Sequence, residues 1–283
     1  MTLEAAAGLL RCPVCAEPLA LTSQGAACPA RHSFDRARQG YLNLLRGPAP
    51  ENADTTDMVA ARVRFLARGW YEPMAAALSD RCLGETFAEA GAGTGHYLAR
   101  ALDDHPAARG LAADVSVAAA RRAAKAHARM AAIVADTWAG LPIRTGTVDT
   151  LLCVFAPRNA AEFHRVLRPG GRLLVALPEP SHLAELRASL GLLDVEEDKD
   201  RKLEAALAGR FARESAWTSV RRVELSPAEV ADLIAMGPNA FHGAAGRRPA
   251  TAVEVTLALR VLVLRRLDPD PSAGPPARSP AAD

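Results

Sequence analysis

The feature that most constrains the fold is the stretch TFAEAGAGTGHYLARAL at residues 86–102, where a short apolar run meets three closely spaced glycines and an Ala-rich helical pattern. The pattern predicts a strand, a tight turn and a helix, and the turn spells E-x-G-x-G-x-G with Glu89, Gly91, Gly93 and Gly95. This differs from the G-x-G-x-x-G of dinucleotide-binding enzymes in the spacing of the last glycine. Because glycine has no Cβ, such a turn lets the backbone approach a ligand closely, which indicates a cofactor site.

Four further apolar runs follow at residues 108–116, 131–138, 149–157 and 171–180, separated by helical stretches. Strands that alternate with helices predict a parallel sheet with right-handed crossovers, and hence a Rossmann-like α/β domain whose ligand binds at the carboxyl ends of the strands. Asp114 ends the second run, where a carboxylate accepts hydrogen bonds from a ribose diol, and Asp136 follows the third. Either acid alone is more typical of a solvated loop, but with the glycines they favour a nucleoside-containing cofactor.

Three of the 5 cysteines lie near the N-terminal end, where Cys12, Cys15, Cys28 and His32 have the spacing of two zinc-ligand pairs. A segment of about 40 residues buries too little apolar surface to fold unaided, and a metal is a common remedy. Because four protein ligands leave no open coordination position, we expect the zinc to be structural. The alternative is unpaired buried cysteines beside an incidental histidine. Cys82 and Cys153 stand apart from this cluster.

Composition bounds the location and the partners of the chain. No signal peptide is recognisable, and apolar runs such as residues 150–156 fall far short of the ~20 residues that span a bilayer, so we expect a cytoplasmic protein with no membrane contact. The net charge of +2 is nearly neutral, but between Arg11 and Arg46 five arginines stand against two acids. A surface that faces nucleic-acid phosphates and an ordinary solvated surface both fit this local excess.

Two other segments have helical patterns. Residues 57–69, DMVAARVRFLARG, predict a helix with Thr55 or Thr56 as its N-cap and Gly69 as its stop. Residues 201–215, RKLEAALAGRFARES, followed by Trp217, predict an amphipathic helix. The final residues, 266–283, are rich in Pro, Ala and Asp, which predicts disorder.

The glycine turn with the two acids resembles the class I S-adenosylmethionine-dependent methyltransferases, and in that class the segment after the fourth strand, here CVFAPRN at residues 153–159, usually carries the chemistry. It lacks the Asn/Asp-Pro-Pro-aromatic turn that suits exocyclic amines, and Cys153 has no neighbouring helper to act as a nucleophile. Methylation of a ring nitrogen requires fewer catalytic groups. It needs only an acceptor for the nitrogen's proton and a close, in-line approach to the methyl donor. The residues alone do not identify that acceptor.

These features together resemble the class I S-adenosylmethionine-dependent methyltransferases, in which Glu89 would lie near the methionine part of the cofactor and Asp136 near the adenine. More specifically, the cysteine module and six further segments resemble the 23S ribosomal RNA guanine-N1 methyltransferases, nearest to the branch that confers tylosin and mycinamicin resistance. The segments are GYLNLL (40–45), ADTTDMVAAR (53–62), GWYEP (69–73), VFAPRN (154–159), PSHLAEL (180–186) and MGPNAFH (236–242).

The resemblance implies roles for individual residues. Cys12, Cys15, Cys28 and His32 would bind Zn²⁺, and the S-adenosylmethionine site would include Tyr71, Glu89, Gly91, Gly93, Thr94, Gly95, Asp114, Asp136 and His182. Without it, Tyr71 packing the linker helix and His182 capping a helix are the simpler interpretations. Glu89 departs from the Asp that the family commonly has. Arg158, Phe241 and His242 follow a strand end or a turn and are the candidates for contacting RNA, since arginine and aromatic planes stack on bases.

We therefore predict an RNA-recognising zinc module (1–46), a linker with a helix (47–84), a Rossmann-like methyltransferase domain (85–265) and a tail (266–283). The expected activity is methylation of a guanine N1 in a 23S rRNA hairpin loop that lines the peptide exit tunnel, with a role in macrolide resistance. Two alternatives stay open: a small-molecule methyltransferase with a structural zinc module, and a non-catalytic RNA-binding protein. The sequence also leaves open whether the chain forms a homodimer.

Overall fold

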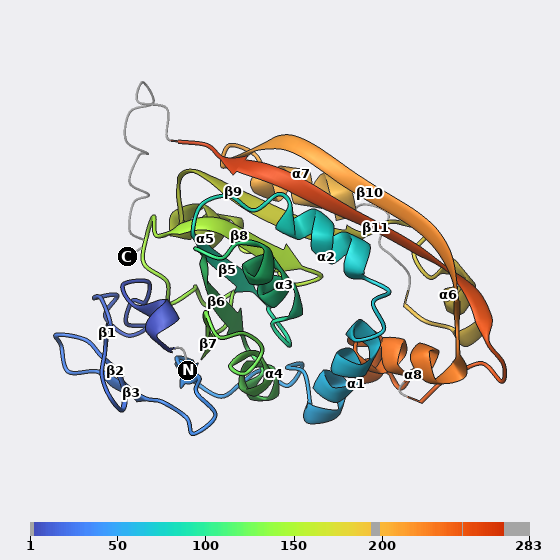
Figure 1. Ribbon diagram of the computed structural model, residues 1–283, viewed down its shortest axis with the longest axis horizontal. Coiled ribbons are helices and arrows are strands. Elements are labelled where there is room, and N and C mark those ends of the chain that lie inside the picture. The colour runs from blue at the N-terminus through green and yellow to red at the C-terminus, as the bar shows by residue number, and fades with distance from the viewer. Residues whose placement is uncertain (1–2, 194–198, 245, 269–283) are drawn as a thin grey trace, which may run out of the picture.

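The computed structural model describes residues 3–193, 199–244 and 246–268, and Figure 1 shows its arrangement. The main sheet has eight strands in the order β10-β11-β9-β8-β5-β6-β7-β4, and a small sheet has the order β1-β2-β3. The main strands are β4 (Leu42–Asn43), β5 (Thr86–Ala90), β6 (Arg109–Asp114), β7 (Met130–Val134), β8 (Val148–Val154), β9 (Leu167–Pro178), β10 (Phe211–Leu225) and β11 (Val253–Arg266).

The strands from β4 to β9 pair in parallel, and β10 and β11 complete the sheet in antiparallel fashion. The five strands predicted from the apolar runs are β5 to β9, and the predicted Rossmann-like α/β fold is confirmed. The strand order reverses beside β5, because β6 lies on one side of it and β8 on the other. A reversal of this kind opens a crevice at the carboxyl ends of the strands.

Helices cover both faces of the sheet (Figure 1). One face packs against α1 (Thr56–Leu66), α2 (Glu72–Ser79), α3 (His96–Asp104), α4 (Val117–Ala123), α6 (Ala184–Leu190) and α8 (Pro227–Ala235). The other packs against η1 (Leu3–Ala6), α5 (Ala160–Val166) and α7 (Lys199–Leu207). Successive residues of β8 alternate between the two cores, with Leu151 and Cys153 in one and Leu152 and Val154 in the other. Side-chain alternation along a strand that is buried on both faces explains its continuous apolar run.

The linker helix forms as predicted. Thr55 is the N-cap of α1, and its side-chain oxygen accepts a hydrogen bond from the Met58 amide at 3.3 Å. The helix ends at Leu66, with Gly69 shortly beyond it in the left-handed region at φ +76°. Its buried apolar positions include Met58 and Phe65, and Phe65 packs in the core that the sheet forms with the neighbouring helices.

The prediction of one helix over residues 201–215 is wrong in its second half. Helix α7 ends at Leu207, Gly209 turns the chain at φ +71°, and Phe211 begins the long strand β10. From Trp217 to Glu224 of β10 half-buried positions alternate with exposed ones, and Trp217 is half-buried. The strand pairs with β11 along its whole length, and such long-range pairing outweighs the local helical preference of the sequence.

The N-terminal module comprises β1 (Ala20–Leu21), β2 (Gly25–Ala27) and β3 (Ser33–Asp35), preceded by η1. It shares a core with the main sheet, because Leu10, which is 0% exposed, forms a β-bridge with Ile143, and β4 pairs in parallel with β7. The predicted domain boundaries stay predictions, and residues 269–283 of the predicted tail lie outside the described residues. Throughout the described ranges, no helix has the length and apolar character needed to cross a bilayer.

Because this core is shared, we expect Leu10→Ala to destabilise the whole chain. Loss of a fully buried leucine costs about 2–5 kcal/mol in free energy of unfolding, and urea denaturation followed by circular dichroism measures it. Val14→Ala, at a side chain 59% exposed in the same module, is the matched control and should stay within about 0.5 kcal/mol of the parent. A separate early transition of the N-terminal module, with the main transition unchanged, would contradict the shared core.

Candidate functional site

A cleft of about 640 Å³ opens at the carboxyl ends of β5, β6, β7 and β8. It brings together most of the residues that the sequence assigned to the cofactor: Tyr71, Glu89, Gly91, Gly93, Thr94, Asp114, Asp136 and His182. Gly95 does not line it. That residue is the N-cap of α3 at φ +74°, and a Cβ there would lie 2.7 Å from the Met130 Cε, so its position serves helix packing.

The glycine turn passes close to its neighbours at the floor of the cleft. Gly91 adopts φ +70°, and a Cβ at this position would overlap the Cβ of Ala156, which follows β8. The amides of Gly91 and Ala92 both donate to the Ala113 carbonyl, at 2.8 and 3.0 Å, and so fix the turn to the end of β6. Only glycine satisfies both the left-handed backbone and the contact with Ala156.

The two acids at the ends of β6 and β7 are positioned by backbone amides. Asp114 accepts hydrogen bonds from the Gly93 amide at 2.7 Å and the Ser116 amide at 2.8 Å. Asp136 accepts one from the Trp138 amide at 2.8 Å. Burial raises the pKa of Asp114 above its usual range, with these amides opposing the shift. Both carboxylates are therefore held in fixed positions on the cleft wall.

Glu89 is the most strongly perturbed acid of the cleft. Its side chain is 1% exposed; one oxygen accepts the Leu98 amide at 3.2 Å, and Oε1 has no partner among the described residues. Burial raises the pKa of Glu89 to about 8. A buried acceptor without a donor indicates that a ligand supplies one. The ammonium of the methionine part of S-adenosylmethionine has that chemistry, so Glu89 and the side-chain-free turn fit this cofactor.

Tyr71 and His182 form a buried pair on the opposite wall. The Tyr71 hydroxyl lies 3.2 Å from the His182 Nε2, and the His182 Nδ1 accepts the Ala258 amide at 3.2 Å. With Nδ1 occupied as an acceptor, neutral His182 carries its proton on Nε2 and donates to the Tyr71 oxygen. Burial lowers the pKa of His182 to about 4, assisted by the nearby Arg187. The pair therefore stays neutral and leaves the tyrosine hydroxyl hydrogen available to a ligand.

Arg62 is a cleft residue that the sequence reasoning missed. It lies on α1, pairs with Asp54, and donates to the Met236 carbonyl at the end of α8 at 2.6 Å. A Cβ at Gly93 would be 2.8 Å from the Arg62 Nη1, so the guanidinium rests on the glycine turn. It thus places a positive charge where a carboxylate of the cofactor's methionine part would need one. The only indication of this role in the sequence was that Arg62 belongs to the segment 53–62, which resembles the methyltransferase family.

Phe155 was also missed as a candidate. It follows β8 directly, lines the cleft, is 43% exposed and has φ +52°, a left-handed conformation that is rare for a bulky residue. Such strain at the end of a strand is common at functional sites. Its ring lies 6.0 Å from that of Tyr71.

Of the three predicted RNA-contacting residues, Arg158 and Phe241 are not brought together in the cofactor cleft. Arg158 lines the cleft beside Phe155, but Phe241, 42% exposed on η2 (Pro238–His242), does not, although Pro238 and Asn239 of the same segment do. The side chain of His242 lies outside the described residues.

The metal cluster forms in the N-terminal module. The four predicted ligand atoms lie within 4.8 Å of one another. The His32 Nδ1 is 3.6 Å from the Cys12 Sγ and 3.4 Å from the Cys28 Sγ, and Cys15 and Cys28 have their sulfurs 3.6 Å apart. Three thiols and one imidazole at these separations suit a tetrahedral Zn²⁺ with Zn–S bonds near ~2.3 Å. All four positions are filled by protein, which fits a structural ion.

Two tight turns aim these ligands at one point. Ala16 and Arg31 have φ of +62° and +64°, an unfavourable region for residues with a Cβ. The Ala16 amide donates to the Cys12 carbonyl at 2.9 Å, and the Arg31 amide donates to the Cys28 carbonyl at 2.9 Å. The first hydrogen bond spans four residues and the second three, so the turns differ, but each places a left-handed residue directly beside a ligand. Metal coordination offsets their strain.

The buried Glu89 predicts a pH dependence of stability. In the unfolded chain Glu89 loses its proton near its ordinary pKa of 4.5, whereas in the folded chain it keeps the proton up to about pH 8. The folded state thus binds more protons between these values, so stability falls as pH rises from about 5 to about 8. Glu89→Gln should flatten this part of the profile, measured by urea denaturation. Glu85→Gln, exposed just before the same strand, should keep the parent slope.

Arg62 predicts a ligand-specific loss of affinity. If its guanidinium binds the carboxylate of the cofactor, Arg62→Ala should weaken S-adenosylhomocysteine about tenfold or more, the usual scale for a charge-assisted hydrogen bond. It should leave 5′-methylthioadenosine, which lacks the amino-acid part, nearly unaffected in the same titration calorimetry. Arg64→Ala is the matched control, because Arg64 joins the same helices through Asp232 at 2.6 Å but is 59% exposed. Equal weakening of both ligands would exclude the contact.

Two family profiles match the chain. The one described as "RlmA, N-terminal", a zinc ribbon, matches residues 10–49. The one described as "Methyltransferase domain" matches residues 87–171. The first covers the metal cluster and the second covers the glycine turn, Asp114 and Asp136.

Curated relatives match over most of the chain. A putative 23S rRNA (guanine-N1)-methyltransferase of Micromonospora griseorubida is 46% identical and covers 91% of this chain and 95% of its own. The 23S rRNA (guanine(748)-N1)-methyltransferase of Streptomyces fradiae is 46% identical, over 82% of this chain and 86% of its own. A putative 23S rRNA (guanine-N1)-methyltransferase of Bacillus subtilis is 31% identical over 64% of this chain and 68% of its own. The chain therefore belongs to the 23S rRNA (guanine-N1)-methyltransferase family, whose S-adenosylmethionine-dependent domain is here preceded by a zinc ribbon.

Proposed function

We propose that this enzyme methylates N1 of one guanine in a hairpin loop of 23S rRNA, at the nucleotide equivalent to the guanine 748 named for the Streptomyces fradiae relative. The loop would line the peptide exit tunnel, and the enzyme would act in the cytoplasm. The observation that carries the proposal is the single cleft that joins the cofactor residues to Phe155 and Arg158. A base delivered past these two side chains reaches the floor where Glu89 and the glycine turn lie.

The cleft suits a target base that is swung out of its loop. Its volume of about 640 Å³ is in the range of sites that enclose a drug-sized molecule. Phe155 offers an aromatic face and Arg158 a guanidinium plane, the two groups on which unpaired bases stack. The chain's contribution to rate would be to hold N1 in line with the methyl donor, since positioning supplies much of the acceleration in such transfers.

The Tyr71–His182 pair would orient the cofactor or the target base. It would not act as the acceptor of the guanine proton. A histidine whose pKa is about 4, with Nδ1 already accepting a backbone hydrogen bond, is a weak base near neutral pH. Burial also raises the pKa of Tyr71 above its usual range, so the hydroxyl stays protonated. The pair would therefore present a fixed hydrogen-bond donor to the cofactor or the base.

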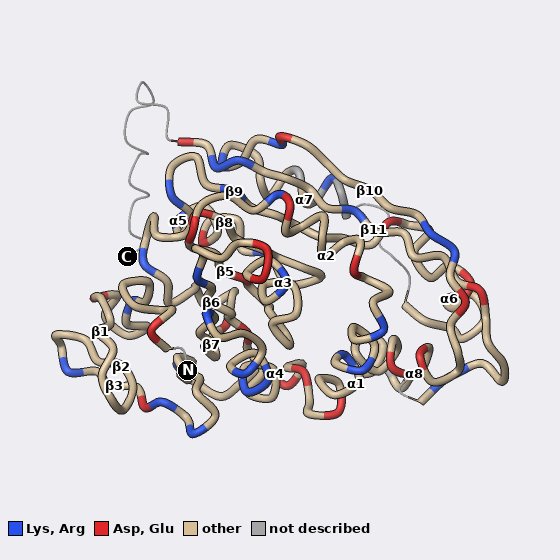
Figure 2. Tube along the Cα trace, in the orientation of Figure 1, with Lys and Arg blue, Asp and Glu red and all other residues tan. Residues whose placement is uncertain are grey.

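The N-terminal module would bind the RNA through the RNA's phosphate backbone and its folded shape. In Figure 2 this module, around β1 to β3, carries basic positions along its outer loops, and all of them are arginines. Arg46, at the end of the module, is exposed and forms no hydrogen bond or ion pair with the described part of the chain. Arginines available in this way neutralise phosphates and fix register without reading sequence.

Resistance to tylosin- and mycinamicin-type macrolides would follow from the product. A methyl group on N1 removes a Watson–Crick donor and adds bulk to a loop of the exit tunnel, which is where such a drug would have to fit. Expression of the enzyme in a macrolide-sensitive host should then raise the inhibitory concentration of tylosin. Methylation without such a rise would assign the enzyme a housekeeping role instead.

The reaction is tested by incubating the purified protein with S-adenosylmethionine and unmodified 23S rRNA. We expect 1-methylguanosine by nucleoside mass spectrometry and a reverse-transcription stop at one loop guanine. An RNA with adenine at that position is the matched control and should give neither signal. Cofactor binding without methylated guanine would refute the proposed substrate.

A further inference from the structure

Trp138 is a large apolar side chain that the fold leaves exposed. It is 65% exposed, in the loop between β7 and β8, and it lines the cofactor cleft. In the described part of the chain, Val14, Phe155 and Leu193 are exposed large apolar residues that also line a cleft, whereas Val220 and Phe241 are exposed elsewhere. Most of the exposed large apolar side chains therefore lie around the clefts, and such surface commonly marks a binding site.

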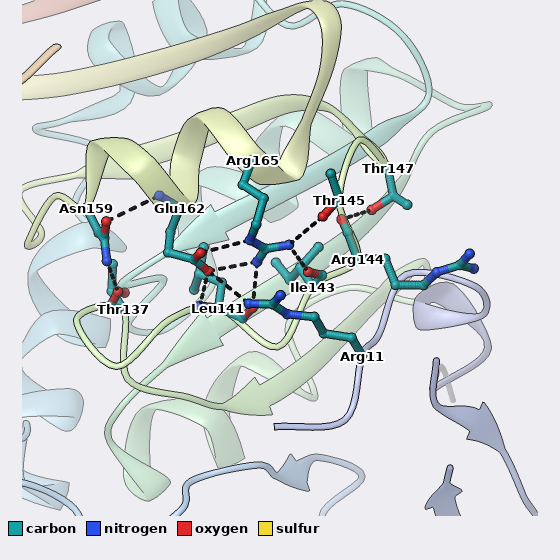
Figure 3. Close-up of polar contacts among 10 residues, drawn as sticks. All are labelled: Arg11, Thr137, Leu141, Ile143, Arg144, Thr145, Thr147, Asn159, Glu162 and Arg165. Carbon is teal, nitrogen blue, oxygen red and sulfur yellow. Dashed lines mark hydrogen bonds and ion pairs between the residues drawn. The ribbon is translucent and has the colours of Figure 1, made fainter. Parts of the chain in front are cut away.

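The loop that carries Trp138 is firmly held, as Figure 3 shows. Asn159, the N-cap of α5, donates from Nδ2 to the Thr137 carbonyl at 3.0 Å. Glu162 accepts the Leu141 amide at 2.8 Å, and Arg165 donates to the Leu141 and Ile143 carbonyls at 2.9 and 2.7 Å. The exposure of the indole is thus a property of an ordered loop and not of a loose one.

The zinc module takes part in the same network. Arg11, next to the zinc ligand Cys12, donates to Glu162 at 3.4 Å, and Glu162 in turn binds Arg165 at 2.7 Å (Figure 3). One carboxylate therefore joins the module, helix α5 and the Trp138 loop. This fixes the distance between the module and the indole before RNA binds.

Two clefts meet at this loop. A smaller one, of about 230 Å³, lies between the zinc module and residues 135–142, and it shares Ala135 and Asp136 with the cofactor cleft. Arg46 lines the smaller cleft and Arg158 the larger one. Neither arginine forms a hydrogen bond or an ion pair with another residue in the described ranges. An exposed aromatic ring on the larger cleft thus lies two residues beyond the pair that both clefts share, and each cleft is lined by one available cation.

We propose that Trp138 stacks on a nucleobase of the RNA next to the target guanine, with Arg46 and Arg158 binding the phosphates on either side. The proposal rests on the 23S rRNA substrate proposed above. Aromatic rings stack on bases irrespective of sequence, and guanidinium groups neutralise the flanking phosphates, so ring and cations together match a nucleotide. A target guanine that enters the larger cleft leaves its neighbour at the rim where Trp138 lies.

The full-length protein is tested for binding to a 23S rRNA hairpin transcript. Trp138→Ala should weaken RNA affinity on the order of tenfold, the usual scale for loss of one stacked base. Trp138→Phe should retain most of the affinity, because a phenyl ring also stacks. Affinity for S-adenosylhomocysteine and the thermal midpoint should not change in either variant. Val220→Ala, at another exposed apolar side chain far along β10, is the matched control.

The position of the stacked base is tested by placing 2-aminopurine at one loop nucleotide at a time. Wild-type protein should quench its fluorescence at a neighbour of the target guanine, and Trp138→Ala should abolish that quenching. Unchanged RNA affinity in Trp138→Ala would overturn the proposal. So would a loss of S-adenosylhomocysteine affinity, which would place Trp138 in the adenine site, or a lowered thermal midpoint. A wild-type protein that methylates no guanine refutes the proposed function instead.

Discussion

The site depends on one steric constraint, the close approach of the glycine turn to the strands around it. A side chain at Gly91 would overlap Ala156, and one at Gly95 would lie 2.7 Å from Met130. The turn can therefore pass between the ends of β6 and β8 and start α3 at the same time. Asp114 is then within reach of the Gly93 amide at 2.7 Å, and Arg62 rests on the turn from the other side. Asp114 and Arg62 thus both contact the glycine turn, where the backbone is not covered by side chains.

Local patterns were sufficient to predict the central sheet and the metal site. Strands β5 to β8 are buried on both faces and read as largely apolar runs, as β8 shows with every residue from Val148 to Val154 buried. The zinc ligands are close in sequence, so their spacing nearly determines their geometry. The same holds for the glycine turn and for Asp114, which are fixed by the ends of adjacent strands.

What the sequence did not predict depends on contacts between distant segments. Strand β10 has a helical pattern at its start and becomes a strand because β11 pairs with it. Arg62 reaches the cleft only because α1 packs beside α8, where Met236 ends the helix. Phe155 needed a backbone angle, φ +52°, that no residue pattern signals. The shared core of the zinc module likewise arises from a bridge between Leu10 and Ile143.

The zinc module is consequently tied to the loop that forms one wall of the cofactor cleft. Its Arg11 reaches Glu162, which holds the Leu141 amide at 2.8 Å, in the loop that also carries Asp136 and Trp138. Its last residues form β4 beside β7, the strand from which that loop emerges. Coordination of the metal by Cys12 would order the chain at Arg11. Through Arg11 and Glu162 it would also stabilise the loop that carries Asp136 and Trp138. Because the loop has Asp136 and Trp138 in the lining of the cofactor cleft, Glu162 and Asn159 together position the residues proposed to contact cofactor and RNA.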